Sequence, residues 1–374
     1  MKFNPGGRLA STAVGLTIVG VLLLSACSSD SNSGGKSSGG SSSAGGGSSC
    51  PTGTLKGEGS TAQKNAMDEW TKQYQQQCSG ATVNYNGTGS GDGVKNFIGK
   101  QVDFAGSDSA LKADKGEVAN AAKTCASPAV DLPMVVGPIA VAFKLKDIKD
   151  AGLTLTPKLV AQIFLGKITK WNDPAITAAN SGVTLPATAI TVFFRSDESG
   201  TTENFEKYLA AAAPADFKAK PSKAWAGTVG QGKAKSGGVQ AAIGATEGGI
   251  GYVEASFAIA GNLSTAKIDN GGGAVAIDAD TASKAAGAAK VVGTGDDVTL
   301  KIDYATKMPG AYPIILVTYE IACTKYADPK IGALVKSFLT YTSGSGQEAL
   351  ANLGYAPIPD SIKAKVTATI AKIS

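Results

Sequence analysis

The sequence predicts an α/β fold, and two patterns support this prediction. Short segments with alternating apolar residues, typical of strands, alternate along the chain with segments whose apolar residues recur at helical spacing. Turns rich in glycine, serine and threonine join several of these strands to the helices that follow. With 374 residues, the chain is also long enough to bury a sizeable core and to form two domains.

The most informative turn comprises residues 195–202, with the sequence RSDESGTT. It follows the apolar, strand-like residues 189–194 and precedes residues 203–209, whose apolar side chains have helical spacing. The turn therefore connects a strand to the N-terminus of a helix. At that point backbone N–H groups lack partners, and a partial positive charge attracts anions.

The residues of this turn suit a small oxyanion. Ser199, Gly200 and Thr201 stand at the helix start, and Gly200 lets the backbone approach a ligand closely. Arg195 supplies a planar charged group that matches two oxygens of a tetrahedral oxyanion, and Asp197 is placed to orient it. The alternative is an ordinary capped helix, with Ser199 or Thr201 as the N-cap and with Arg195 and Asp197 as a surface ion pair.

Three other glycine- and hydroxyl-rich turns also stand at the ends of strand-like segments. They comprise residues 55–62 (LKGEGSTA), 87–93 (GTGSGDG) and 102–109 (VDFAGSDS). The first two lead into segments with helical spacing. Four such turns at strand ends can converge on one ligand.

In this order, the motifs Gly-Ser-Thr, Gly-Thr-Gly-Ser-Gly, Gly-Ser-Asp and Arg-Ser-Asp-x-Ser-Gly-Thr resemble those of the PstS family, of actinobacterial type. Members of this family are the phosphate-binding components of high-affinity phosphate ABC importers. The resemblance extends from Leu55 to the C-terminus and includes residues 168–174, 249–254 and 312–314. It implies a two-lobed, type II-like periplasmic-binding-protein fold, with the ligand cleft between lobes joined by two crossing strands.

The resemblance also implies a set of phosphate-binding residues. They are Ser60, Thr61, Ala62, Ser90, Asp108, Arg195, Asp197, Ser199, Gly200 and Thr201. Ala62 would contribute its backbone N–H, and Asp197 would brace Arg195.

Two positions depart from the usual pattern. Ala62-Gln63 replaces a bulky apolar residue and proline, and Glu198 replaces a frequent glycine. Glu198 would suit the helix dipole if it faced solvent and would weaken anion binding if it turned inward.

Asp108 is the residue expected to select the ligand. Phosphate at neutral pH retains an O–H that a carboxylate can accept, whereas sulfate has no proton to give. A buried acceptor that an analogue leaves unpaired can discriminate by about four orders of magnitude. The alternative role for Asp108 is the N-cap of a helix starting near Ala110.

The implied fold predicts the extent of the lobes. We expect lobe I to comprise residues 50–144 and 312–374, and lobe II residues 145–311, with crossings near residues 143–145 and 308–310. The ligand turns then come from both lobes, so the cleft would close by hinge motion.

The N-terminus predicts export. Lys2 and Arg8 precede the apolar residues 13–24, a stretch too short to span a membrane. The tetrapeptide that follows resembles a bacterial lipobox and ends at Cys27, so residues 1–26 read as a signal peptide and Cys27 as a lipidated residue. The alternative is a small-residue cleavage site without lipid. Residues 27–49, rich in serine and glycine, would tether the protein to the outer face of the cell membrane.

Four cysteines remain after Cys27, and an exported chain should oxidise them. Three pairings exist. Cys50 and Cys78 each precede a strand-like segment, and they would meet if those strands were parallel neighbours. Cys125 precedes one strand and Cys323 follows another, so they would meet if those strands paired antiparallel. We therefore expect Cys50–Cys78 and Cys125–Cys323 rather than a mixture of free and paired thiols.

Composition narrows the function. Histidine is absent, which excludes histidine-based catalytic triads and metal sites with histidine ligands. The formal net charge is +5, but the sequence has no basic tract that would suggest nucleic-acid binding. We expect no cofactor and no metal. The expected partners of a monomer are inorganic phosphate, the transmembrane permease subunits of an ABC importer and, through its lipid, the membrane.

Two other functions stay open. A phosphatase on the same scaffold would need an activated nucleophile such as Ser199 or Thr61, and no histidine is present to act as its base. The other alternative is a surface protein that acts in adhesion or recognition, and only the expected location of the protein supports it.

Overall fold

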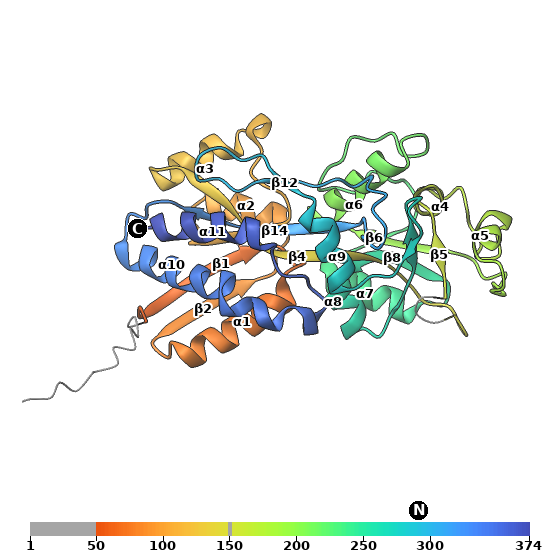
Figure 1. Ribbon diagram of the computed structural model, residues 1–374, viewed down its shortest axis with the longest axis horizontal. Coiled ribbons are helices and arrows are strands. Elements are labelled where there is room, and N and C mark those ends of the chain that lie inside the picture. The colour runs from red at the N-terminus through yellow and green to blue at the C-terminus, as the bar shows by residue number, and fades with distance from the viewer. Residues whose placement is uncertain (1–49, 149–151) are drawn as a thin grey trace, which may run out of the picture. The chain divides into compact units, whose positions relative to one another are not determined.

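One nine-stranded sheet organises the described part of the chain, residues 50–148 and 152–374 of a computed structural model (Figure 1). Its strands lie in the order β2-β1-β3-β14-β4-β8-β6-β7, and β9 pairs with β4. Their bounds are β1 Gly53–Gly59, β2 Ala81–Asn86, β3 Phe104–Ser107, β4 Ala129–Phe143, β6 Thr191–Arg195, β7 Gln231–Lys233, β8 Gly249–Glu254, β9 Ser264–Thr265 and β14 Ile315–Cys323. Smaller sheets contain β5 Thr154–Leu155, β10 Lys267–Asp269 and β11 Ala274–Val275, and also β12 Lys290–Val291 with β13 Leu300–Lys301.

Helices alternate with these strands, which confirms the predicted α/β class. They are α1 Lys64–Gln77, α2 Ser90–Ile98, α3 Glu117–Cys125, α4 Pro157–Phe164, α5 Pro174–Ala179, α6 Gly200–Ala212, α7 Lys235–Ala245, α8 Ala255–Ala260, α9 Ala279–Gly287, α10 Pro329–Ser343 and α11 Asp360–Lys372. Short 3₁₀ segments occur at Ala113–Lys115, Ser345–Ala349 and Ala351–Leu353. Within the described ranges, no helix is both long and apolar enough to cross a bilayer.

Two long strands, β4 and β14, connect the two halves of the sheet (Figure 1). β14 pairs antiparallel with β4 from Ala129 to Pro138, and from Ile139 onward β4 pairs with β8 instead. The first half thus contains the parallel strands β1, β2 and β3, and the second half contains the parallel strands β6, β7 and β8. The sequence predicts that the chain crosses between the halves at residues 143–145. The change of partner comes earlier, at Ile139, because the buried apolar residues at the end of β4 already pair with β8 of the second half.

Each half has a hydrophobic core of its own. Trp70, Phe104 and Phe338 belong to the core of the first half. Trp171 and Phe205 belong to the core of the second half. Separate cores are what two lobes require, because each can then stay folded while the two move relative to one another.

Residues 290–301 depart from the predicted second lobe. The Val298 N–H donates to the Asp131 carbonyl (3.1 Å), the Val298 side chain is buried in the core of the first half, and Lys372 forms an ion pair with Asp296. Residues 290–301 pack against the first half because its hydrophobic core buries the Val298 side chain. The chain then returns to the second half, where Tyr304 is buried.

Both predicted disulfides are present. Cys50 pairs with Cys78, and Cys125 pairs with Cys323, each with a Cα–Cα distance of 5.4 Å. The strand geometry is the predicted one, because β1 and β2 are parallel neighbours whereas β4 and β14 pair antiparallel. The predicted signal peptide, Cys27 and the tether lie outside the described residues.

Candidate functional site

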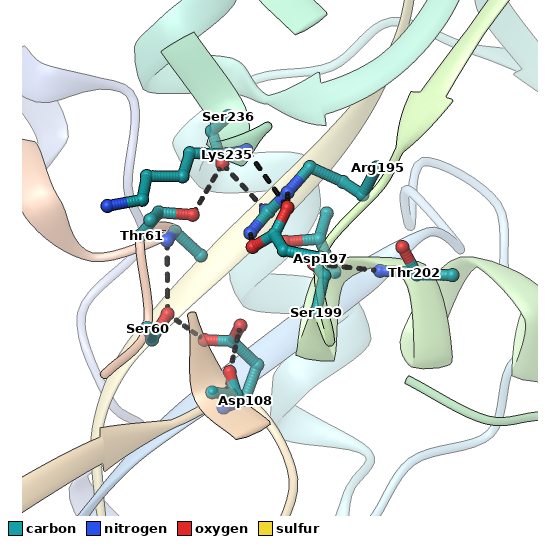
Figure 2. Close-up of polar contacts among 12 residues, drawn as sticks. Ser60, Thr61, Asp108, Arg195, Asp197, Ser199, Thr202, Lys235 and Ser236 are labelled. Carbon is teal, nitrogen blue, oxygen red and sulfur yellow. Dashed lines mark hydrogen bonds and ion pairs between the residues drawn. The ribbon is translucent and has the colours of Figure 1, made fainter. Parts of the chain in front are cut away.

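The four predicted turns meet at one place. Ser60 follows β1, Asp108 follows β3, Ser90 begins α2, and Arg195 ends β6 just before α6. Figure 2 shows Ser60 and Asp108 of the first half facing the side chains of the second half. The approach is close, since a Cβ atom added to Gly200 would lie 2.5 Å from the Asp108 Cβ and 2.8 Å from the Ser90 Oγ. Only glycine fits at the start of α6.

Arg195 is buried and held in one orientation. Its Nε and Nη2 donate to Asp197 Oδ1 (2.8 Å) and Oδ2 (2.5 Å), and its side chain is 2% exposed. Asp197 also accepts the Lys235 N–H. Burial lowers the pKa of Arg195, but Asp197 outweighs burial and the net shift is upward. The alternative of a surface ion pair is therefore wrong, because Arg195 is buried.

A second glycine explains how the first half approaches this pair. Gly89, the residue before α2, has a φ of +108°, which side chains of L-residues rarely allow. A Cβ atom there would lie 2.9 Å from Asp197 Oδ2. The Gly-Thr-Gly-Ser-Gly turn thus places Gly89 against the Arg195–Asp197 pair, while the next residue, Ser90, donates to Asp108.

Asp108 lies in a ring of hydroxyl groups. Its Oδ1 accepts from Ser60 Oγ (2.5 Å) and Thr318 Oγ1 (2.7 Å), and its Oδ2 accepts from Ser90 Oγ (3.0 Å). Burial raises the pKa of Asp108, and the three hydroxyls and Arg195 offset part of this rise. No helix begins at Ala110 or Leu111, so Asp108 is not an N-cap. Its Oδ2 keeps room to accept one more O–H.

The start of α6 leaves N–H groups free, as predicted. Ser199 is the N-cap, because its Oγ accepts the Thr202 N–H (3.3 Å). The Ser199 N–H donates to the Lys223 carbonyl (2.9 Å). Among the described residues, the N–H groups of Gly200 and Thr201 have no partner and are available to an anion.

The Gly-Ser-Thr turn uses some of its predicted donors internally. The Ala62 N–H donates to Ser60 Oγ (3.0 Å), so it would have to leave this bond to contact a ligand. Thr61 Oγ1 instead contacts Ser236 Oγ of the second half (3.0 Å). The turn nevertheless places the Ser60 hydroxyl on Asp108 and the Thr61 hydroxyl on Ser236, which accepts from Arg195.

Glu198 points away from the site. Its carboxylate pairs with Lys95 Nζ (2.6 Å), and its side chain is half exposed. The bond from Lys95 lowers the pKa of Glu198. The unusual residue therefore does not bring a third carboxylate to the anion.

Three residues at the site escaped sequence reasoning. Ser236, at the start of α7, contacts both Thr61 Oγ1 (3.0 Å) and Arg195 Nη1 (3.1 Å) (Figure 2). Its signal was visible, since residues 230–238 (GQGKAKSGG) are a fifth glycine-rich segment, which contains strand β7 and the start of α7. Thr318 and Glu254 lie in buried strands without such a turn.

Comparison with known proteins agrees with this geometry. A family model described as a PBP superfamily domain matches residues 44–345. Phosphate-binding protein PstS 3 of Mycobacterium tuberculosis is 44% identical over 378 residues, and phosphate-binding protein PstS 2 of the same species is 42% identical. In both cases the alignment covers all of both chains. The chain belongs to the PstS family.

Solved structures establish the two-lobed fold of this family. A putative phosphate ABC transporter substrate-binding protein with bound phosphate from Clostridium perfringens has a TM-score of 0.60 and 18% identity, covering 82% of this chain and all of its own. The high-affinity periplasmic phosphate-binding protein PfluDING has a TM-score of 0.68 and 24% identity, covering 84% of this chain and 93% of its own. Both chains share the periplasmic-binding-protein architecture predicted from the PstS motifs.

Proposed function

We propose that this protein binds inorganic phosphate outside the cytoplasm and delivers it to an ABC-type importer. One observation carries the proposal. A buried guanidinium, the free N–H groups at the start of α6 and a buried carboxylate meet at the boundary of the two halves. Membership of the PstS family supports the same function.

The proposed contacts divide into donors and one acceptor. The donors are Arg195, the N–H groups of Thr61, Ala62, Gly200 and Thr201, and the hydroxyls of Thr61, Ser199 and Thr201. Ser60 and Ser90 donate their single hydroxyl hydrogens to Asp108, so each would have to leave this bond to donate to the anion. Asp108 is the acceptor, and it would take the O–H of a protonated phosphate oxygen. Asp197 orients Arg195 without facing the anion.

The ligand would be enclosed by movement of the proposed lobes, residues 50–144 with 312–374 and residues 145–311, apart from residues 290–301. Contacts between the two halves surround the site, and they include Thr61–Ser236 (3.0 Å), Lys95–Glu198 (2.6 Å) and Lys112–Glu203 (2.7 Å). A protein that closes on its ligand should contract when phosphate binds, and its melting temperature should rise because the ligand binds only the folded state.

Small-angle scattering and thermal unfolding, each with and without phosphate, test this proposal. A smaller radius of gyration and a higher melting temperature with phosphate are expected. Arsenate should act as phosphate does, because it has the same shape and the same O–H. A protein that neither contracts nor gains stability would contradict phosphate binding by closure.

We further propose that the protein binds without turnover. Ser199 Oγ accepts a backbone N–H, and Thr61 Oγ1 contacts another hydroxyl, so neither hydroxyl contacts a base among the described residues. Purified protein should not hydrolyse a phosphomonoester above background. Hydrolysis that Ser199→Ala abolished would favour the phosphatase alternative.

Delivery to permease subunits would be aided by the proposed lipid anchor at Cys27. A tether of residues 27–49 lets an anchored protein reach a transporter and raises its local concentration there. Cys27→Ala should block processing or release the protein from the membrane fraction. Protein starting at Ser28 should still bind phosphate. Recovery of the natural protein as soluble, unlipidated material would contradict the anchor but not the phosphate site.

A further inference from the structure

Glu254 is a buried carboxyl at the site that the proposed contact set does not include. It ends β8 and is fully buried. Its Oε1 accepts the Thr201 hydroxyl (2.5 Å), while its Oε2 has no hydrogen-bond partner among the described residues. Thr201 is one of the proposed phosphate ligands, so Glu254 acts on the ligand through it.

Burial disfavours an ionised carboxylate at Glu254, Asp108 adds to this effect, and Arg195 opposes it. The groups that act on it are Arg195 from β6, Asp108 after β3 and the Tyr355 phenol. Arg195 is the one cation among them, and Asp197 already neutralises it through two hydrogen bonds. An ionised Glu254 beside Asp108 would give the buried site two uncompensated negative charges before any anion entered.

The proton on Glu254 determines what Thr201 can do. A hydroxyl has one hydrogen, so while Thr201 donates to an ionised Glu254 it can offer only lone pairs to an anion. If Glu254 is protonated at Oε1, it donates to Thr201 Oγ1, and the Thr201 hydrogen is free to point at the anion. The same 2.5 Å contact then runs in the opposite direction.

We propose that Glu254 carries a proton while phosphate is bound, and that this proton makes the Thr201 hydroxyl a donor to the anion. Glu254 is therefore a positioning residue that couples phosphate affinity to pH. Burial raises the pKa of Glu254, offset in part by Arg195 and Thr201, which agrees with the neutral form. The inference rests on the proposed phosphate site.

The test compares phosphate affinity between about pH 6 and pH 9 in the natural protein, Glu254→Gln and the control Asp131→Asn. The glutamine amide can donate to Thr201 as a protonated carboxyl does, so Glu254→Gln should bind phosphate within about threefold of the natural protein at the acidic end. Above the pKa of Glu254, the natural protein should lose affinity relative to Glu254→Gln by up to tenfold per pH unit, because one proton is linked to binding. The titration of phosphate itself affects both proteins equally, so it cancels in the ratio of their affinities. Asp131 is a buried carboxyl outside the site, and Asp131→Asn should follow the natural profile.

A direct measurement covers the case in which Glu254→Gln does not fold. Because Glu320 is itself a buried carboxyl with a raised pKa, infrared spectra with phosphate are also measured in Glu320→Gln. The natural protein and Glu320→Gln should both contain the carbonyl band of a protonated buried carboxyl, sensitive to deuterium, and Glu254→Gln should lose part of this intensity if it folds. Parallel pH profiles, a hundredfold loss of affinity in folded Glu254→Gln at acidic pH, or no such band in phosphate-bound Glu320→Gln would overturn the inference. A natural protein that binds no phosphate would instead overturn the proposed function, and the inference with it.

Discussion

At the scale of single residues, the site depends on one arginine. The chain contains two arginines, and the other, Arg8, lies in the predicted signal peptide. Every other positively charged side chain of the sequence is lysine, whose point charge cannot bind two oxygens as a planar guanidinium can. The one arginine outside the predicted signal peptide thus lies at the candidate site.

Replacement of Arg195 should abolish tight binding without unfolding the protein. Arg195→Ala removes a charge-assisted contact in an enclosed site, so we expect phosphate binding to weaken by about 2 to 5 kcal/mol in calorimetry. Arg195→Lys should restore only part of this loss. Melting curves of both variants serve as the control for folding, and unchanged affinity in the alanine variant would place the anion elsewhere.

A second residue prediction concerns stability against pH. Glu320 lies in β14 behind the site, fully buried, and neither of its carboxylate oxygens has a hydrogen-bond partner among the described residues. Burial raises the pKa of Glu320 to about 8, which the neighbouring Gln63 amide offsets only in part. The folded protein therefore keeps this proton at pH values where the unfolded chain releases it. The titration of Glu320 costs no stability at acidic pH, and its cost grows from about pH 4.5 until about pH 8.

Between about pH 4.5 and pH 7, the free energy of unfolding should fall by about 3 kcal/mol in the natural protein relative to Glu320→Gln. Denaturant titration at several pH values measures this difference. Glu348→Gln, which removes an exposed carboxyl, is the matched control and should follow the natural protein. A constant difference between Glu320→Gln and the natural protein would show that Glu320 does not titrate in this range.

At the scale of elements, the site residues in the turns were predictable and those in the buried strands were not. The start of α6 at Gly200 and the N-cap at Ser199 follow from local chemistry, since each residue type there has a preferred position. Thr318 and Glu254 lie in buried, mainly apolar strands, and their roles depend on which strand lies opposite. Such long-range pairing leaves no local signal, so sequence reasoning missed both.

The disulfides fasten elements at very different separations along the chain. Cys50 and Cys78 are 28 residues apart, whereas Cys125 and Cys323 are 198 apart and join the end of α3 to the end of β14. Since a longer closed loop removes more entropy from the unfolded chain, replacing the second pair by alanine should cost about 5 kcal/mol and the first pair about 4 kcal/mol. Denaturant unfolding of the two double variants measures both costs. The reverse order would contradict the loop-length argument.

At the scale of the whole molecule, β4 and β14 make the two halves one protein. The family motifs predicted two lobes and two crossings, but the position of the change of partner at Ile139 depends on register, which the sequence does not specify. The sequence also does not specify that residues 290–301 pack against the first half, because the burial of Val298 depends on tertiary contacts. The site lies where the halves meet, so its selectivity tests the whole architecture.

The ratio of phosphate to sulfate affinity, measured by equilibrium competition in the natural protein and in Asp108→Asn, tests the central claim most directly. The claim is that one buried carboxylate among donors selects a protonated oxyanion. The natural protein should prefer phosphate by about 10⁴-fold, and Asp108→Asn should lose most of this preference because an amide no longer repels sulfate. Sulfate that displaces phosphate readily from the natural protein, or a preference unchanged in Asp108→Asn, would contradict the account.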